Sequence, residues 1–266
     1  MKQNRLIRYT IWGILIICPW ILTSCDMFHE DLPECRLFVK FKYDYNMLFT
    51  DAFHTQVDKV ELYVFDKDGK FLSSQVEEGE ALATGNYQME VKLPIGEYQF
   101  LAWAGARDSY DIYTPRGENT ITDMRLRLKR EESLIISKEL EPLWYGYISD
   151  VDFTGTSHQT ETIDLIKDTN KIRFVFQGYS DSYIRATSGD NWNVNMNDYE
   201  YEIIESNGHL AYDNSLLEDD VLSFRPYYME QKSSSADMYL LLKITILPAK
   251  KNISVSMSMS MRLHRS

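Results

Sequence analysis

The chain has 266 residues, with 28 basic and 40 acidic side chains and a formal net charge of −12 at pH 7. An acidic surface repels phosphate backbones, and the sequence has no basic stripe, so we exclude nucleic acid as a partner. The five histidines are scattered, without metal-ligand spacing or a neighbouring nucleophile motif. We therefore expect no catalytic residue, no metal and no small-molecule substrate, and predict that the protein is not an enzyme.

Residues 1–24 have the order of a secretory signal peptide. Three basic residues precede an apolar stretch from Ile11 to Leu22, which is shorter than the about twenty residues that a membrane-spanning helix needs. The stretch ends in Leu-Thr-Ser-Cys at 22–25, which resembles the lipobox of bacterial lipoproteins. We expect cleavage after residue 24 and a diacylglycerol on the Cys25 thiol. This covalent lipid is the only prosthetic group that we predict.

Residues 25–35 read as a lipid-anchored polar tether with four acidic side chains. Acidic residues directly after a lipid-bearing cysteine resemble the surface-export signals of some outer-membrane lipoproteins. The pattern therefore predicts a surface-exposed protein held in the outer membrane by its lipid. With Cys18 in the leader and Cys25 lipidated, Cys35 has no intramolecular partner. We interpret Cys35 as a small buried residue, with pairing between molecules as the alternative.

The first predicted strand covers residues 36–43. Its alternating apolar side chains are Leu37, Val39, Phe41 and Tyr43. Alternation with a period of two is typical of a half-buried strand, because successive side chains point to opposite faces of a sheet. Each of these four side chains contributes about 1.5–3 kcal/mol when it is fully buried.

Short strands separated by turns continue along the chain, and helical spacing is not sustained. Residues 57–65 form a second strand pattern that ends in Asp-Lys-Asp-Gly at 66–69 and resumes at Phe71, which predicts a β-hairpin. The same turn could begin a calcium loop, but the further ligands of such a loop are missing. Residues 105–119 read as a loop. The further predicted strands are 87–93, 98–104, 121–128, 134–136, 162–166, 172–177, 199–204 and 239–247.

This spacing of strands and turns predicts an all-β protein built from two β-sandwich domains in tandem. Residues 149–162 are rich in small polar residues and read as a seam. We place the N-terminal β-sandwich at 36–167 and the C-terminal β-sandwich at 168–266. Residues 180–197 read as a long polar loop with Trp192, of a kind that often carries binding sites.

Several separated segments share a pattern with one group of proteins. They are Asp-Leu-Pro-Glu-Cys at 31–35, 41–47, 51–54, 64–71, Leu-Trp-Tyr-Gly at 143–146, 165–172 and 207–214. Together they resemble the FimB/Mfa-type fimbrial anchor subunits of type V pili, over residues 25 to 228. The resemblance implies two transthyretin-like β-sandwiches, a lipid on Cys25 and a place at the base of a pilus on the outer membrane.

The resemblance also implies a mechanism. Stalk subunits of that family lose an amino-terminal strand and accept a donor strand from a neighbouring pilin, whereas anchor subunits keep their first strand and end assembly. The candidate retained strand here carries Leu37, Val39, Phe41 and Tyr43. We therefore expect a lipid-anchored subunit that anchors a type V pilus, limits its length and contacts pilin subunits through β-strands.

Two alternatives stay open. The segment 250–262 alternates serine with apolar residues, which fits an amphipathic strand, but it does not resemble the family and we favour a truncated end. On this interpretation the C-terminal sandwich is incomplete. The 18 tyrosines and five tryptophans suggest a glycan-binding surface lipoprotein instead of a pilus anchor. Most of these tyrosines fall within strand patterns, where packing explains them.

Overall fold

The computed structural model describes residues 34–179, 199–233, 237–248 and 257–261. The predicted signal peptide, Cys25, most of the tether and the loop with Trp192 lie outside the described residues. Within the described part of the chain, no helix has the length and apolar character to cross a membrane. The predicted all-β class is confirmed, because the helical elements are short: α2 (Phe53–Gln56), η2 (Leu82–Thr84) and η3 (Ile121–Asp123).

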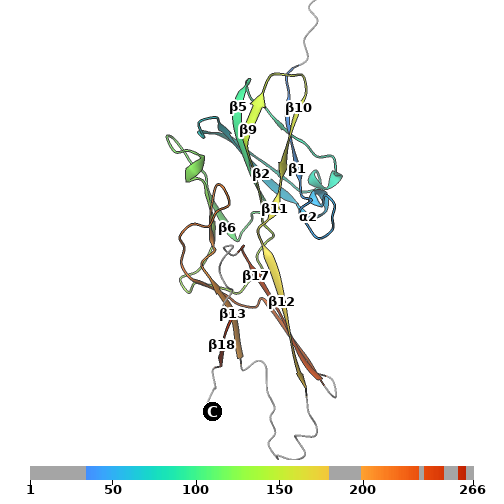
Figure 1. Ribbon diagram of the computed structural model, residues 1–266, viewed down its shortest axis with the longest axis vertical. Helices are drawn as coiled ribbons and strands as arrows, with labels where there is room; N and C mark the ends of the chain where they lie inside the picture. The colour runs from blue at the N-terminus through green and yellow to red at the C-terminus, as the bar shows by residue number, and fades with distance from the viewer. Residues whose placement is uncertain (1–33, 180–198, 234–236, 249–256, 262–266) are drawn as a thin grey trace, which may run out of the picture. The chain divides into compact units, whose positions relative to one another are not determined.

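Two sheets enclose a first hydrophobic core (Figure 1). One has the strand order β10 (Gln159–Asp164), β1 (Leu37–Lys42) and β4 (Met89–Val91). The other has the order β11 (Ile166–Lys167), β9 (Trp144–Phe153), β5 (Gly96–Ala104), β2 (Lys59–Asp66) and β3 (Phe71–Glu78). Alternate side chains of both sheets, among them Val39, Leu62 and Phe100, fill the space between them. This arrangement is a β-sandwich.

The middle of the five-stranded sheet is buried on both faces. Leu62 and Val64 of β2 belong to the first core, while the intervening Tyr63 and Phe65 belong to a second core. Strand β5 repeats the pattern, and its Trp103 is completely buried on the side of the second core. A strand buried on both faces reads as a continuous apolar run, which is what the sequence shows here.

Three further sheets surround the second core. One has the order β14 (His209–Ala211), β7 (Arg125–Leu128) and β6 (Tyr110–Tyr113). Another has the order β18 (Met257–Met261), β13 (Tyr199–Glu205), β15 (Leu222–Phe224) and β8 (Ile135–Ile136). The third has the order β12 (Asn170–Tyr179), β17 (Asp237–Ile246) and β16 (Tyr228–Ser233). Side chains such as Leu126, Phe224 and Ile244 pack into this core.

The predicted hairpin at 66–69 is confirmed. The Asp66 side chain accepts hydrogen bonds from the backbone N–H groups of Asp68 (3.0 Å) and Lys70 (2.8 Å). Gly69 has a φ of +80°, and an added Cβ would lie 3.0 Å from the Ile121 side chain. The turn therefore requires the residue type that the sequence places there.

Other predictions are wrong. Residues 149–153 and 159–162, which we interpreted as a polar seam, belong to the strands β9 and β10, where Asp150 and Asp152 are exposed while Val151 and Phe153 are buried. The predicted loop at 105–119 contains β6, and the predicted strand 121–128 begins with a 3₁₀ turn. Cys35 is exposed, not buried.

Residues 257–261 pair antiparallel with β13, so the strand interpretation of the tail is correct for this part.

The domain boundary at residue 168 stays a prediction. The described residues from Arg36 onward form one unit by their contacts. The second core combines side chains from both sides of residue 168, such as Trp103 and Phe224. The two predicted sandwiches therefore share apolar contacts.

Asp168 itself is a buried carboxylate, only 2% exposed. Its Oδ1 accepts a hydrogen bond from Asn214 Nδ2 at 2.8 Å, while its Oδ2 has no partner among the described residues. Burial raises the pKa of Asp168 to about 7, against the smaller opposing effect of the Asn214 hydrogen bond. The folded state therefore favours the protonated carboxyl.

This predicts a pH-dependent effect of Asp168→Asn. An aspartate with a pKa of 3.8 when unfolded and about 7 when folded makes the protein less stable as the pH rises between these values. The variant should therefore gain free energy of unfolding relative to the wild type between pH 5 and pH 8, by up to about 3 kcal/mol. Urea denaturation at both pH values measures this.

Asp213→Asn is the matched control. Hydrogen bonds from Ser215 lower the pKa of Asp213, so its carboxylate stabilises the fold at neutral pH and loses this effect as the pH falls. The control should show no gain at pH 8. A difference between Asp168→Asn and the wild type that does not change with pH would contradict the assignment of a raised pKa.

Candidate functional site

The candidate retained strand is β1, which lies between two neighbours in its sheet. It pairs in parallel with β10 over Leu37–Lys42 and antiparallel with β4. The four predicted side chains are all buried, between 0% and 5% exposed: Leu37, Val39, Phe41 and Tyr43. The structure therefore brings together the strand residues expected from the sequence. Their role in assembly stays a prediction, and Cys25 lies outside the described residues.

Aromatic contacts hold the carboxyl-terminal end of β1. The Phe41 ring stacks on the Phe53 ring of α2, with 5.6 Å between centroids. The Tyr43 ring meets the edge of Trp144 of β9 at 5.9 Å. Such pairs add about 0.5–1.5 kcal/mol each to the gain from burial. The end of β1 is thus tied both to its own side of the sandwich and to the opposite sheet.

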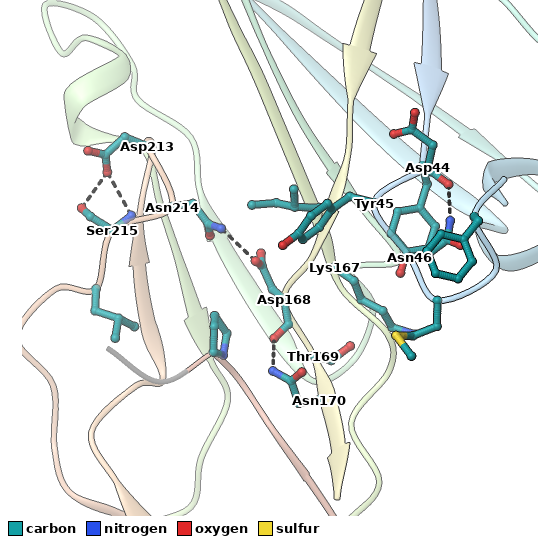
Figure 2. Close-up of a pocket in the computed structure, with 16 residues that line it drawn as sticks. Asp44, Tyr45, Asn46, Lys167, Asp168, Thr169, Asn170, Asp213, Asn214 and Ser215 are labelled. Carbon is teal, nitrogen blue, oxygen red and sulfur yellow. Dashed lines mark hydrogen bonds between the residues drawn. The ribbon is translucent and has the colours of Figure 1, made fainter. Parts of the chain in front are cut away.

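A groove of about 1110 Å³ opens where β1 ends (Figure 2). Its lining comes from the turn after β1, from the segment that joins β11 to β12, from the turn after β14, and from Pro248. The side chains used below are Tyr45, Met47, Phe49, Asp168, Asp213, Asn214 and Ser215. The groove therefore combines segments that are far apart in the sequence.

The turn at 44–50 forms one wall of this groove, and Asn46 organises it. The Asn46 amide donates to the carbonyl oxygens of Tyr43 (2.7 Å) and Thr50 (2.8 Å), and its Oδ1 accepts from the Leu48 N–H (2.8 Å). Asp51 Oδ1 accepts from the Tyr43 N–H at 2.9 Å. These local bonds hold the backbone of a turn whose side chains do not pack into a core.

The side chains that this turn presents are large, apolar and exposed. Tyr45, Met47 and Phe49 are 82%, 89% and 91% exposed. Phe49 also has a φ of +55°, which is unusual for a bulky residue. Exposed apolar side chains that lie together on an ordered segment mark an interaction site more often than single exposed ones do.

The wall made by residues 168 and 213–215 is polar. Asp213 Oδ1 accepts from the N–H (3.1 Å) and the hydroxyl (2.6 Å) of Ser215. Between them, Asn214 has a φ of +63° and directs its amide toward Asp168, as Figure 2 shows. The Asn214 Oδ1, like the Asp168 Oδ2, has no hydrogen-bond partner within the described residues. The wall can therefore accept hydrogen bonds from a ligand.

One cation lies at the groove. Burial lowers the pKa of Lys167, with a further effect from Lys171, and its Nζ lies 5.0 Å from the centroid of the Trp144 ring. In the part of the chain that the structure describes, no group of three or more His, Cys, Asp and Glu residues is arranged to hold a metal ion. The chemistry that this groove offers is therefore hydrogen bonding and stacking.

Sequence reasoning did not find the groove. Its walls come from residues 43–49, 166–170 and 213–216, which only the fold brings together. A signal was present, since three of the segments that resemble the anchor subunits, 41–47, 165–172 and 207–214, supply most of the lining. The loop with Trp192, which we expected to carry binding, lies outside the described residues.

Comparison with known sequences gives a family. The model of the fimbrillin-A associated anchor proteins Mfa1 and Mfa2 matches residues 32–262. The minor fimbrium anchoring subunit Mfa2 of Porphyromonas gingivalis is 23% identical over 203 residues. These residues are 75% of this chain but 60% of that relative, so the chain spans less than two thirds of the relative's length.

Solved structures share the fold. A Bacteroides thetaiotaomicron protein, provisionally described as polysaccharide-binding, is 59% identical with a TM-score of 0.76, over 86% of this chain and 77% of that chain. A Bacteroides ovatus protein, provisionally described as an adhesin, is 27% identical with a TM-score of 0.71, over 89% of this chain and 74% of that chain. The Porphyromonas gingivalis anchor Mfa2, at 19% identity and a TM-score of 0.66 over 85% and 77%, shows the same fold. Together with the family match, these likenesses confirm the predicted resemblance: the chain belongs to the fimbrillin-A associated anchor proteins, the family of Mfa1 and Mfa2.

Proposed function

We propose that this protein is a lipid-anchored outer-membrane subunit that anchors a fimbria, limits its length and binds pilin subunits through β-strands. Membership of the anchor family supports the association with a fimbria. The observation that carries the proposal is the position of β1, which pairs with β10 along its whole length and with β4 over its first three residues, and which buries every inward side chain. This function requires no catalysis, and no cofactor other than the lipid on Cys25.

A filled sheet ends a polymer that grows by strand donation. Donor strands bind by adding main-chain hydrogen bonds to an open sheet and side chains to its pockets. Here β1 already supplies the main-chain hydrogen bonds and the buried side chains. Its four buried side chains together contribute roughly 6–12 kcal/mol to the stability of the fold, as an upper value. This is comparable to the whole stability of a typical domain. A donor strand from a pilin would therefore have to replace all of this burial before β1 could leave the sheet.

The sequence supports the proposed lipid on Cys25. The segment 22–25 ends an apolar stretch with a cysteine in the lipobox pattern. Each buried CH₂ of an acyl chain contributes about 0.8 kcal/mol, so that two or three chains give a stable attachment where one does not. A stable attachment is what a subunit at the base of a fimbria needs against pulling forces.

A second candidate function is the binding of a glycan. The structure that is 59% identical to this chain belongs to a protein provisionally described as polysaccharide-binding. The groove at the end of β1 supplies a place for such a ligand, because exposed aromatic side chains lie beside hydrogen-bond acceptors. Glycan binding in this groove and anchoring through β1 share Tyr43 but otherwise use different residues, so one does not exclude the other.

The lipid proposal predicts the behaviour of Cys25→Ala. Without the thiol, no acyl chain can be attached, and we expect the protein to move from the membrane to the soluble periplasmic fraction. Detergent phase partition of cell envelopes measures this. Cys35→Ala is the matched control and should stay in the detergent phase. Retention of Cys25→Ala in that phase would rule out the anchor at this residue.

The assembly proposal predicts the effect of charges in β1. In Val39→Asp/Phe41→Asp, two unpaired carboxylates would enter the first core, which is costly enough to expel the strand. Cells with this variant, like cells without the protein, should carry pili that are longer or are shed into the medium. Electron microscopy of the cells and immunoblots of the medium measure both.

Lys40→Asp controls for the added charge, because Lys40 lies on the outer face of the same strand. Its pili should match those of the wild type. Immunoblots of the membrane fraction show whether each variant is present. Pili of equal length and retention in wild-type, deletion and double-variant cells would refute the assembly proposal.

A further inference from the structure

The groove at the end of β1 has two chemically different walls. Tyr45, Met47 and Phe49 present apolar surface from a turn whose backbone is fixed by Asn46. Asp168 and Asn214 present oxygen atoms from the polar wall. A matching ligand therefore has an apolar face together with several hydrogen-bond donors.

The polar wall has unused acceptor capacity. Asp168 Oδ2 and Asn214 Oδ1 are both buried, and neither has a partner in the described part of the chain. An unsatisfied buried acceptor is destabilising, and most such atoms in native proteins have a partner. Above about pH 7, where the Asp168 carboxyl is ionised, hydroxyl groups of a ligand would supply donors here without breaking any existing hydrogen bond.

Backbone strain also collects at the groove. Among the described residues, three that are not glycine have a positive φ: Phe49, Leu134 and Asn214. Two of them, Phe49 and Asn214, line the groove. Bulky residues are rare in this region and, where they occur, cluster at sites that clamp ligands, whereas asparagine adopts it readily. The unusual backbone of Phe49 therefore coincides with the exposed aromatic rings of the groove.

The charges of the groove select against anions. Asp44, Asp168 and Asp213 line it, with Lys167 as the cationic lining residue. Lys42 pairs with Asp44 from outside the lining. Burial lowers the pKa of Lys167 and raises that of Asp168, whose carboxylate forms above about pH 7, so the acidic groups outnumber this single basic group in the lining. A phosphate or an acidic sugar would find little compensation for its charge here.

We propose that this groove binds a neutral saccharide, with Tyr45 and Phe49 against the C–H face of a sugar ring and with Asp168 and Asn214 accepting hydrogen bonds from its hydroxyl groups. A sugar presents an apolar ring face and many hydroxyl donors, which matches the two walls. A peptide offers fewer donors per unit length. The inference rests on glycan binding, the second candidate function, and is independent of the lipid and of pilus length.

The test uses the full chain purified in detergent and a panel of neutral polysaccharides: mannan, dextran and arabinogalactan. Affinity gel electrophoresis should show retardation of the wild type by at least one of them. Tyr45→Ala/Phe49→Ala should weaken binding by about tenfold or more, because each aromatic contact contributes about 0.5–1.5 kcal/mol. Ile95→Ala, a change at an exposed apolar residue outside the groove lining, should bind as the wild type does.

Asp168→Asn separates binding from folding. The amide keeps an oxygen for Asn214 but replaces the unpartnered acceptor with a donor, so the variant should bind the retained polysaccharide more weakly while its fold is at least as stable at pH 8. A residue with only a structural role would not show this combination.

Three outcomes would overturn the proposal, and they are distinguishable. If the wild type binds neither the neutral polysaccharides nor an acidic one, glycan binding itself is refuted. If the wild type binds and all groove variants bind equally well, the ligand site lies elsewhere on the protein. If only an acidic polysaccharide such as polygalacturonate is bound, the inferred neutral ligand is wrong. None of these outcomes bears on the membrane anchor, which the Cys25→Ala partition tests separately.

Discussion

Burial of one sheet on both faces is the constraint on which the rest of the structure depends. Residues of β2 and β5 alternate between the two hydrophobic cores, so each core uses the same backbone as one of its walls. Side chains such as Phe100 and Trp103 are neighbours on one scaffold but belong to different cores. Because close-packed interiors tolerate little change in volume, a shift of this sheet would disturb the packing of both cores. The position of β1 and the shape of the groove therefore both rest on this sheet.

How well each strand could be predicted from the sequence depended on its pattern of burial. Strand β1 alternates between buried and partly exposed residues, so its apolar set was visible in the sequence. Strand β9 was not among the predicted strands, and Asp150 and Asp152 gave its end the composition of a loop, although Val151 and Phe153 are buried. The groove could not be predicted in this way, because Asp168 and Asn214 become neighbours only through tertiary packing. Local patterns carry no information on such pairings.

The two proposed activities meet at one residue. Tyr43 ends the inward row of β1, packs against Trp144, lines the groove and gives its N–H to Asp51. The turn with Tyr45 and Phe49 follows directly in the chain. A change in the position of β1 would therefore move one wall of the groove, and an occupied groove would hold the end of the strand. This is coupling through covalent and packing contacts within a few residues.

The pairing of β1 also has a consequence for the order of folding. Its parallel neighbour is β10, so Leu37 cannot form its pair until Gln159 is available. Its other neighbour, β4, lies some fifty residues further along the chain. If the chain is exported amino terminus first, as the proposed signal peptide requires, this apolar segment emerges long before the residues that cover it. Closing such a long loop is slow compared with forming a hairpin. The segment therefore spends part of the life of each new molecule uncovered, and a periplasmic chaperone that shields extended apolar strands would be of most use in that interval.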